Sequence, residues 1–212
     1  MASVGVPSRE GGSLQVVLAS SGADTRAFRL EWPAGTVLWE LGPPATLAAA
    51  GEALKGGGFD VGRGRLLRRV GAELREGLFG DVLQLNGYHP TRPSLWVVQG
   101  VSGLGRGGWD DFVAAAADVI AAGSQLVGVL PAAEVGTPGE AASMLAANGI
   151  LAHVATLGDA CAELGLEPPP APHGEELLAV HATKQRPSLE EIELYHYHVE
   201  QAVSDGDEDG RR

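Results

Sequence analysis

The 212 residues carry a formal net charge of −12, from 27 acidic and 15 basic side chains, and 44% of them are hydrophobic. This length and apolar fraction suffice for one sizeable α/β domain and exclude wholesale disorder. The acidic balance disfavours binding to a nucleic-acid backbone, and no apolar run reaches the roughly 20 residues that cross a bilayer.

Strands and helices alternate along the chain in the pattern of apolar residues. Short apolar runs bounded by Gly, Pro or Ser predict strands, and longer segments with helical spacing predict helices. In chain order we expect strand 14–19, strand 36–41, helix 45–55, strand 65–70, helix 79–85, strand 94–99, helix 109–122, strand 125–130, helix 140–148, strand 150–155, helix 157–164 and strand 177–182. Because these strands are apolar on both faces, they predict a mainly parallel sheet covered on both sides.

The helix predicted over residues 109–122 illustrates how a boundary is placed. Asp110 and Asp111 would lie in its first turn, where acidic side chains complement the helix dipole. Gly123 directly follows the last helical position and predicts its end. The expected start is therefore Trp109.

The first residues give little information on location. Residues 1–12 are expected to be disordered and lack the hydrophobic region of a signal peptide. They are weakly similar to a transit peptide, with no acid before Glu10. We therefore expect a soluble, cytoplasmic protein, with import into an organelle left open.

The chain changes character after the last predicted strand. Residues 185–203 are expected to contain a C-terminal amphipathic helix, because Ser188 and Glu191 form a capping box and apolar residues follow at helical spacing. A helix over residues 188–203 would pack on the domain or bind a partner. Residues 204–212 predict an acidic, disordered tail.

The ends of the first two predicted strands carry groups suited to a nucleotide-like cofactor. Ligands of such sheets lie at the carboxyl ends of the strands. Gly22, in the loop over residues 20–24, would let backbone approach a ligand, and Glu40 ends the second strand, where an acid can bind ribose hydroxyls. A strand-to-helix turn and a solvated strand end are the alternatives for the loop and for Glu40. The full Gly-x-Gly-x-x-Gly motif is absent, which disfavours NAD.

Residues 17–33, with the run Gly-Ala-Asp-Thr-Arg, closely resemble the first motif of the leucine carboxyl methyltransferase family. The resemblance continues in four segments, similar to the family's Glu-x-Asp-x-Pro, Asp-Leu-Arg, Pro-Thr-x-Trp-x-x-Glu-Gly and Pro-Gly-Ser motifs: residues 37–44, 72–75, 92–101 and 122–126. It implies an α/β, Rossmann-like class I methyltransferase sheet with helices on both faces over residues 13–184. It also implies S-adenosyl-L-methionine (SAM) as the cofactor.

The resemblance implies cofactor-binding roles for seven residues. They are Ser20, Gly22, Asp24, Glu40, Glu73, Leu74 and Gln99. By this resemblance Gly22 packs against SAM and Asp24 is the acid of the same loop. Glu73 lies near the adenine and Gln99 near the methionine end of the cofactor, although a purely structural role for Gln99 is also open.

The sequence departs from the family pattern at positions that bear on binding. Gly42 stands where the family has its ribose-binding acid, and Gln99 replaces a glutamate. Two lost charge-assisted hydrogen bonds, at roughly 1.5–3 kcal/mol each, would weaken SAM binding about a hundredfold or more. The family's N-terminal helical region has no counterpart in these 212 residues. A degenerate, inactive methyltransferase-fold protein that acts as an interaction module is therefore the alternative to an enzyme.

The expected reaction is O-methyl transfer to a carboxylate or hydroxyl of a small molecule or protein. Displacement at a sulfonium depends mainly on proximity and orientation, and a carboxylate acceptor needs no base, so no catalytic residue is named. His89 could accept a proton, but His89 and Tyr88 are more simply interpreted as surface residues of a loop. His196 and His198 are two residues apart and do not share a helix face, so no metal site is expected.

Two further features have simple structural interpretations. Cys161, the single cysteine, falls on a predicted helix and is expected to be a buried apolar side chain. Arg63, Arg65, Arg68 and Arg69 form a basic cluster without interleaved aromatic residues. A solvated helix face explains this cluster better than nucleic-acid binding.

Overall fold

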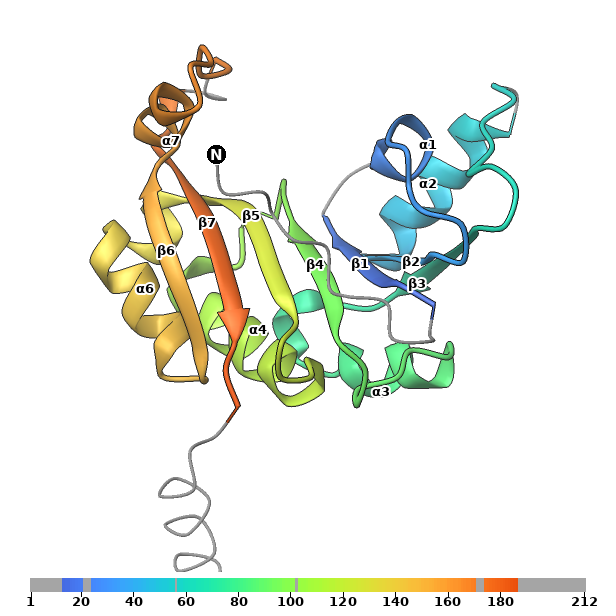
Figure 1. Ribbon diagram of the computed structural model, residues 1–212, viewed down its shortest axis with the longest axis horizontal. Helices are drawn as coiled ribbons and strands as arrows, with labels where there is room; N and C mark the ends of the chain where they lie inside the picture. Colours follow the sequence, from blue (N-terminus) through green and yellow to red (C-terminus); the bar gives the residue numbers. More distant parts are fainter. Residues whose placement is uncertain (1–12, 21–23, 56, 102, 171–173, 187–212) are drawn as a thin grey trace, which may run out of the picture.

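The sheet has the strand order β3-β2-β1-β4-β5-β7-β6 in the computed structural model, which describes residues 13–20, 24–55, 57–101, 103–170 and 174–186 (Figure 1). The strands are β1 (Gln15–Ala19), β2 (Val37–Gly42), β3 (Leu66–Gly71), β4 (Ser94–Val98), β5 (Gln125–Pro131), β6 (Ile150–Thr156) and β7 (Leu177–Lys184). Strand β7 runs antiparallel to both of its neighbours, and the other pairs are parallel. The prediction of a mainly parallel sheet is confirmed.

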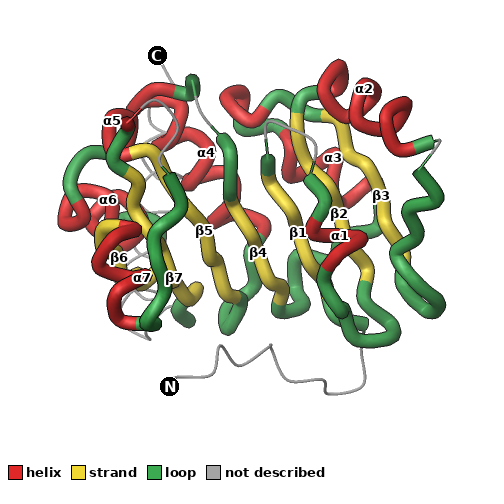
Figure 2. Tube along the Cα trace, turned by 90° about the horizontal axis from the view of Figure 1, so that it is seen from above, coloured by secondary structure: helices red, strands yellow, loops and turns green. Residues whose placement is uncertain are grey.

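Helices lie on both faces of the sheet, as predicted. On one face lie α3 (Phe79–Leu85), α4 (Gly105–Val119) and α6 (Pro138–Ala146), and on the other α1 (Arg26–Arg29) and α2 (Pro44–Leu54). Figure 2 shows α1 and α3 on opposite sides of the strands β1 and β2. Three short helices follow strands along the chain: η1 (Leu74–Glu76) after β3, α5 (Ala132–Val135) after β5 and α7 (Leu157–Glu163) after β6.

The larger core fills the space between the sheet and α3, α4 and α6. Trp96 of β4 is fully buried there, with its ring centroid 6.1 Å from that of Phe79 and 6.2 Å from that of Tyr88. A smaller core lies on the opposite face, where Val16, Leu18 and other side chains pack beneath α1. Apolar side chains on both faces of β1 thus explain why its sequence is apolar throughout.

Most predicted boundaries agree with the structure to within two residues, but that of α4 was wrong. This helix begins at Gly105 and ends at Val119, so Asp110 and Asp111 lie in its second turn. The Glu134 carboxylate accepts hydrogen bonds from the N–H of Gly105, the first helical residue, and from the N–H of Gly103 in the preceding loop. A carboxylate far along the chain therefore replaces the local acids that the sequence suggested.

Several sequence predictions lie outside the described residues. These are the disordered residues 1–12, the helix over residues 188–203 and the tail over residues 204–212. In the described ranges no helix is long and apolar enough to cross a membrane. The same ranges contain no group of three His, Cys, Asp or Glu side chains placed to hold a metal ion.

Candidate functional site

The carboxyl ends of β1, β2 and β4 lie side by side. Ala19, the last residue of β1, is in register with Leu41 of β2 and Val98 of β4. The pairing extends one residue further, because Ser20 N–H donates to the Leu41 carbonyl and Gln99 N–H donates to the Ala19 carbonyl, each at 3.1 Å. The chain passes to β2 on one side of β1 and to β4 on the other, so this is the point at which such sheets bind ligands.

Three of the predicted residues lie at this edge. Ser20 is buried at the end of β1, whereas Gln99 is exposed directly after β4. Glu73 is also exposed and lies between the end of β3 and η1. Gly22 lies outside the described residues. The structure therefore brings two exposed polar side chains, Glu73 and Gln99, to the edge that the sequence indicated.

Asp24 is part of a buried ion pair with Arg26. Its Oδ1 accepts the backbone N–H of Arg26 at 2.8 Å, and the guanidinium Nε lies 2.9 Å from both carboxylate oxygens. Both side chains are at least nine-tenths buried. The Arg26 carbonyl in turn accepts the Trp32 indole N–H at 3.1 Å. Asp24 thus holds the turn that begins α1.

Glu40 is almost completely buried, at 1% exposure, and is not the solvated strand end that was one alternative. Its Oε2 accepts a hydrogen bond from Arg69 Nε at 2.9 Å, while Oε1 has no hydrogen-bond partner in the described part of the chain. Two residues on, a Cβ added to Gly42 would lie only 2.4 Å from the Ser20 carbonyl oxygen. An acid at position 42, as in the family pattern, would therefore require the end of β1 to move.

Leu74 packs in the larger core at 3% exposure. Its neighbour Arg75 is exposed and donates a hydrogen bond to the carbonyl of Gly103, in the loop after β4. Of the Leu-Arg pair that resembles the family's Asp-Leu-Arg motif, Leu74 thus packs in the core and Arg75 bonds to the loop after β4.

Sequence reasoning missed Glu134, a half-buried residue of α5. Its carboxylate accepts the N–H groups of Gly103 and Gly105 and the indole N–H of Trp109. These partners are 25 to 31 residues away in the chain. No local motif marks such a contact, so no sequence signal would have found it.

A buried polar network lies at the opposite edge of the sheet, where the parallel strands begin. The Tyr88 hydroxyl lies 2.8 Å from Ser94 Oγ and donates to the Val119 carbonyl at 3.2 Å. Burial raises the pKa of Tyr88, against smaller lowering contributions from hydrogen bonds with Ser94 and Trp96. The prediction of a surface position is confirmed for His89 and was wrong for Tyr88. Both precede β4, at the end of the sheet opposite the candidate site.

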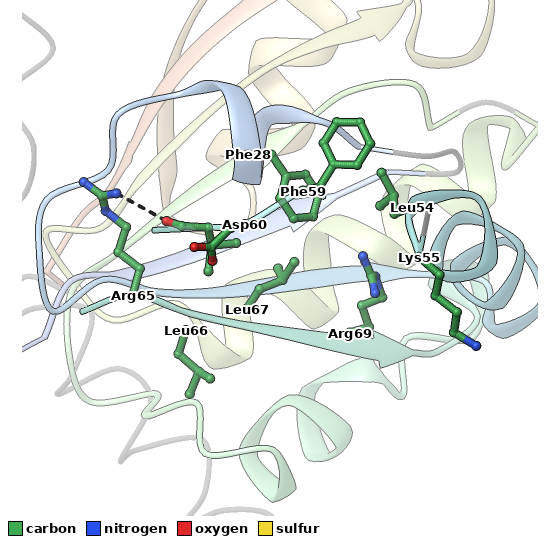
Figure 3. A pocket seen from close by; sticks show the side chains of 11 residues that line it. Phe28, Leu54, Lys55, Phe59, Asp60, Arg65, Leu66, Leu67 and Arg69 are labelled. Carbon is green, nitrogen blue, oxygen red and sulfur yellow. Dashed lines mark hydrogen bonds between the residues drawn. The ribbon is translucent and has the colours of Figure 1, made fainter. Parts of the chain in front are cut away.

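A hollow of about 380 Å³ lies beside β3, between α1 and α2 (Figure 3). Phe28 and Phe59 form part of its wall, with ring centroids 5.7 Å apart, and Arg69 lines it from β3. Neither Glu73 nor Gln99 lines this hollow. It is therefore separate from the strand ends that form the candidate site.

The predicted helical face for the arginine cluster was wrong. Arg68 and Arg69 belong to β3, and Arg65 lies in the loop before it. The Arg65 guanidinium donates to the carbonyls of Trp32, at 2.5 Å, and Val61, at 3.3 Å. These arginines therefore support the packing of β3 and its loop.

Comparison with known proteins finds similarity to one family in sequence and a shared fold in structure. Residues 7–103 match the family described as leucine carboxyl methyltransferase. The chain is 28% identical over 206 residues to O-methyltransferase 1, chloroplastic, of Oryza sativa subsp. japonica, covering 92% of this chain and 57% of that protein. It is 40% identical over 87 residues to a putative SAM-dependent methyltransferase of Mycolicibacterium vanbaalenii, covering 41% of this chain and 28% of that protein. The chain thus spans less than two thirds of the length of these curated relatives.

Solved methyltransferase structures share the architecture at low sequence identity. The CurJ carbon methyltransferase has a TM-score of 0.53 at 10% identity, covering 84% of this chain and 50% of that one. The StiE O-MT segment has a TM-score of 0.52 at 13% identity, covering 90% of this chain and 74% of that one. These likenesses establish the fold alone. The chain is thus similar to the leucine carboxyl methyltransferase family over residues 7–103, and its structure has an α/β, Rossmann-like fold.

Proposed function

We propose that this chain is the cofactor-binding part of a SAM-dependent methyltransferase that acts on an oxygen of a carboxylate or hydroxyl. The observation that carries the proposal is the meeting of β1, β2 and β4 at one edge, where Ser20 is buried after β1, Gln99 is exposed after β4 and Glu73 is exposed after the neighbouring β3. The names of the rice and mycobacterial relatives support this activity.

The residues at this edge fit a cofactor with hydroxyl and ammonium groups. The exposed Glu73 carboxylate can accept hydrogen bonds from donors of the nucleoside, and the Gln99 amide oxygen can accept one from an ammonium group. Glu40 is paired with Arg69 and Asp24 with Arg26, so we assign these two acids to positioning the chain around the site. Leu74 supports η1 from the core.

When bound, SAM would supply an electrophilic methyl group, carried on a sulfonium, for transfer to an acceptor oxygen. The contribution of this chain is to hold the donor at a defined place and orientation, which can lower a barrier by several kcal/mol. A carboxylate acceptor releases no proton and needs no base, whereas a hydroxyl acceptor must release its proton to a base or to water.

The identity of the methyl acceptor stays a prediction. Binding of a partner through residues 188–203 stays one as well. The acceptor is proposed as a small molecule or a protein carboxylate. The rice relative is named chloroplastic, which supports an organellar location as the alternative to the cytoplasm.

Calorimetric titration with SAM and S-adenosylhomocysteine tests the proposal. We expect binding of both ligands, and we expect Gln99→Glu to bind SAM about tenfold more tightly, because a charged acceptor strengthens the hydrogen bond to the ammonium group by about 1.4 kcal/mol. Gln185→Glu is the matched control, since it makes the same charge change at an exposed position after β7. Absence of binding at millimolar ligand would contradict the proposal and favour an interaction module.

A further inference from the structure

The loop that follows β4 is held by one carboxylate from the helix that follows β5. Glu134 Oε1 accepts the N–H of Gly103 at 2.6 Å. Its Oε2 accepts the N–H of Gly105 and the indole N–H of Trp109, each at 3.0 Å. Both oxygens are thus used, and their three donors belong to the loop and to the first two turns of α4.

The loop itself has a backbone conformation that needs support. Gly103 and Gly105 have φ values of 79° and 68°, in the left-handed region that glycine reaches without steric cost. Glycine also leaves the unfolded chain many conformations, so ordering these residues is entropically expensive. Arg75 donates to the Gly103 carbonyl, so both polar groups of that peptide unit have long-range partners.

The start of α4 depends on the same contacts. Its N-cap residue, Leu104, makes no side-chain hydrogen bond, and its first turn contains no acid. The first amides of a helix have no partner within the helix and attract negative charge. Glu134 supplies that charge from α5, and in doing so it links the end of β5 to the end of β4.

This loop leaves the sheet directly after Gln99, at the edge proposed to bind SAM. Gly100 follows Gln99 with a φ of 68°, and no atom lies within 4 Å of where its Cβ would be. Val101, buried in the larger core, holds the first part of the loop, and Glu134 and Arg75 hold its far end.

We propose that Glu134 is a positioning residue for the cofactor: it holds the loop after β4 in the shape that receives the methionine half of SAM. This inference rests on the proposed function. A residue that only capped α4 would contribute to stability and leave the dissociation constant for SAM unchanged, whereas a positioning residue affects both loop order and SAM affinity.

Glu134→Gln is the variant to compare with the wild-type protein. It keeps the size of the side chain but removes the charge, and its NH₂ group cannot accept a hydrogen bond. We expect amide hydrogen exchange at Gly103 and Gly105 to accelerate about tenfold or more in the SAM-free protein, and the dissociation constant for SAM to rise about tenfold or more.

Three further variants complete the experiment. Glu134→Asp keeps the charge on a shorter side chain and should lie between wild type and Glu134→Gln in both measurements. Glu163→Gln, at an exposed position near the end of α7, makes the same charge change and should affect neither. If Glu134→Gln fails to fold, the exposed Arg75→Gln tests the same loop, because it removes the bond to the Gly103 carbonyl.

The two measurements separate the possible results. Unchanged exchange in Glu134→Gln would overturn the assignment of Glu134 as the residue that holds the loop. Faster exchange with an unchanged dissociation constant would overturn its positioning role and leave it as a helix cap. A wild-type protein that binds no SAM would overturn the proposed function together with the cofactor half of this inference, while the exchange data would still decide the loop.

Discussion

The parallel strands begin at one edge of the sheet, the amino edge, and end at the opposite one, the carboxyl edge. These two edges are stabilised by different kinds of contact. At the amino edge, buried polar side chains bond to one another: Tyr88 lies 2.8 Å from Ser94 Oγ, and Ser94 N–H donates to Ser124 Oγ at 2.9 Å. Gln15, at the start of β1, is buried and bonds to both polar groups of the His89 backbone. The contacts of Ser94 with Ser124 and of Gln15 with His89 join residues 30 and 74 positions apart in the chain.

At the carboxyl edge, polar side chains are exposed to solvent. Gln99 and Glu73 are exposed, and the loop after β4 contains glycines in left-handed conformations. Glu134 and Arg75 bond to the far end of this loop, and Val101 of the loop packs in the larger core. The comparison indicates that the amino edge stabilises the fold and the carboxyl edge is available to a ligand. Substitutions at the two edges should therefore affect different measurements.

Trp96→Ala should have the largest effect, because it removes a fully buried indole that packs against Phe79 and donates to Tyr88 and Ser94. We expect a loss of about 3–5 kcal/mol in the free energy of unfolding, measured by urea denaturation. The control is Leu85→Ala, at an 87% exposed position, with a change within about 0.5 kcal/mol. Equal effects of the two variants would contradict the role given to this core.

Arg69→Met would show whether the carboxyl half of the sheet contains a contact that matters for stability as the packing of Trp96 does. It leaves the buried Glu40 carboxylate without its cation, and we expect a loss of about 1.5–3 kcal/mol in urea denaturation. The double variant with Glu40→Gln should recover part of this loss, since no buried charge remains. Additive losses in the double variant would show that the two side chains do not interact.

Tyr88→Phe removes the central hydroxyl of the amino-edge network and should cost about 1 kcal/mol in unfolding free energy, because Ser94 and Trp96 keep a bond to each other. The wild-type protein should also show a pH effect. Burial raises the pKa of Tyr88 above 10.0, so the folded state retains the proton more strongly than the unfolded state. Stability should stay constant below pH 10 and fall as the pH rises above it, and the fall should be smaller in Tyr88→Phe.

Glu140→Gln should have the smallest effect, because it alters an exposed contact at the carboxyl edge. Hydrogen bonds from the Thr137 backbone and side chain, followed by Arg106, lower the pKa of Glu140 from 4.5 to about 2. A depressed pKa means that its stabilising contribution is present above pH 4.5 and is lost as the pH falls toward about 2. Carbon NMR titration of the carboxyl group measures the pKa, and urea denaturation should show a weaker pH dependence in the variant. A pKa near 4.5 would contradict the capping contact.

The sequence located the candidate site better than it assigned roles within it. Gln99 and Glu73 could be placed at the edge because each follows a predicted strand, and parallel strands end at the same side of a sheet. The partners of Asp24 and Glu40 could not be derived in this way. Glu40 meets Arg69 only because β2 and β3 pair in one particular register.

The sequence by itself determined the order of strands and helices and the edge at which to look for a ligand. Those features follow from apolar periodicity and from strand direction, which are properties of short segments. Only the tertiary structure decided that α4 begins at Gly105, that Tyr88 is buried and that Glu134 holds the loop after β4. Each of these depends on a hydrogen bond or packing contact between residues distant in the chain, and a local pattern does not specify which distant residue will be the partner.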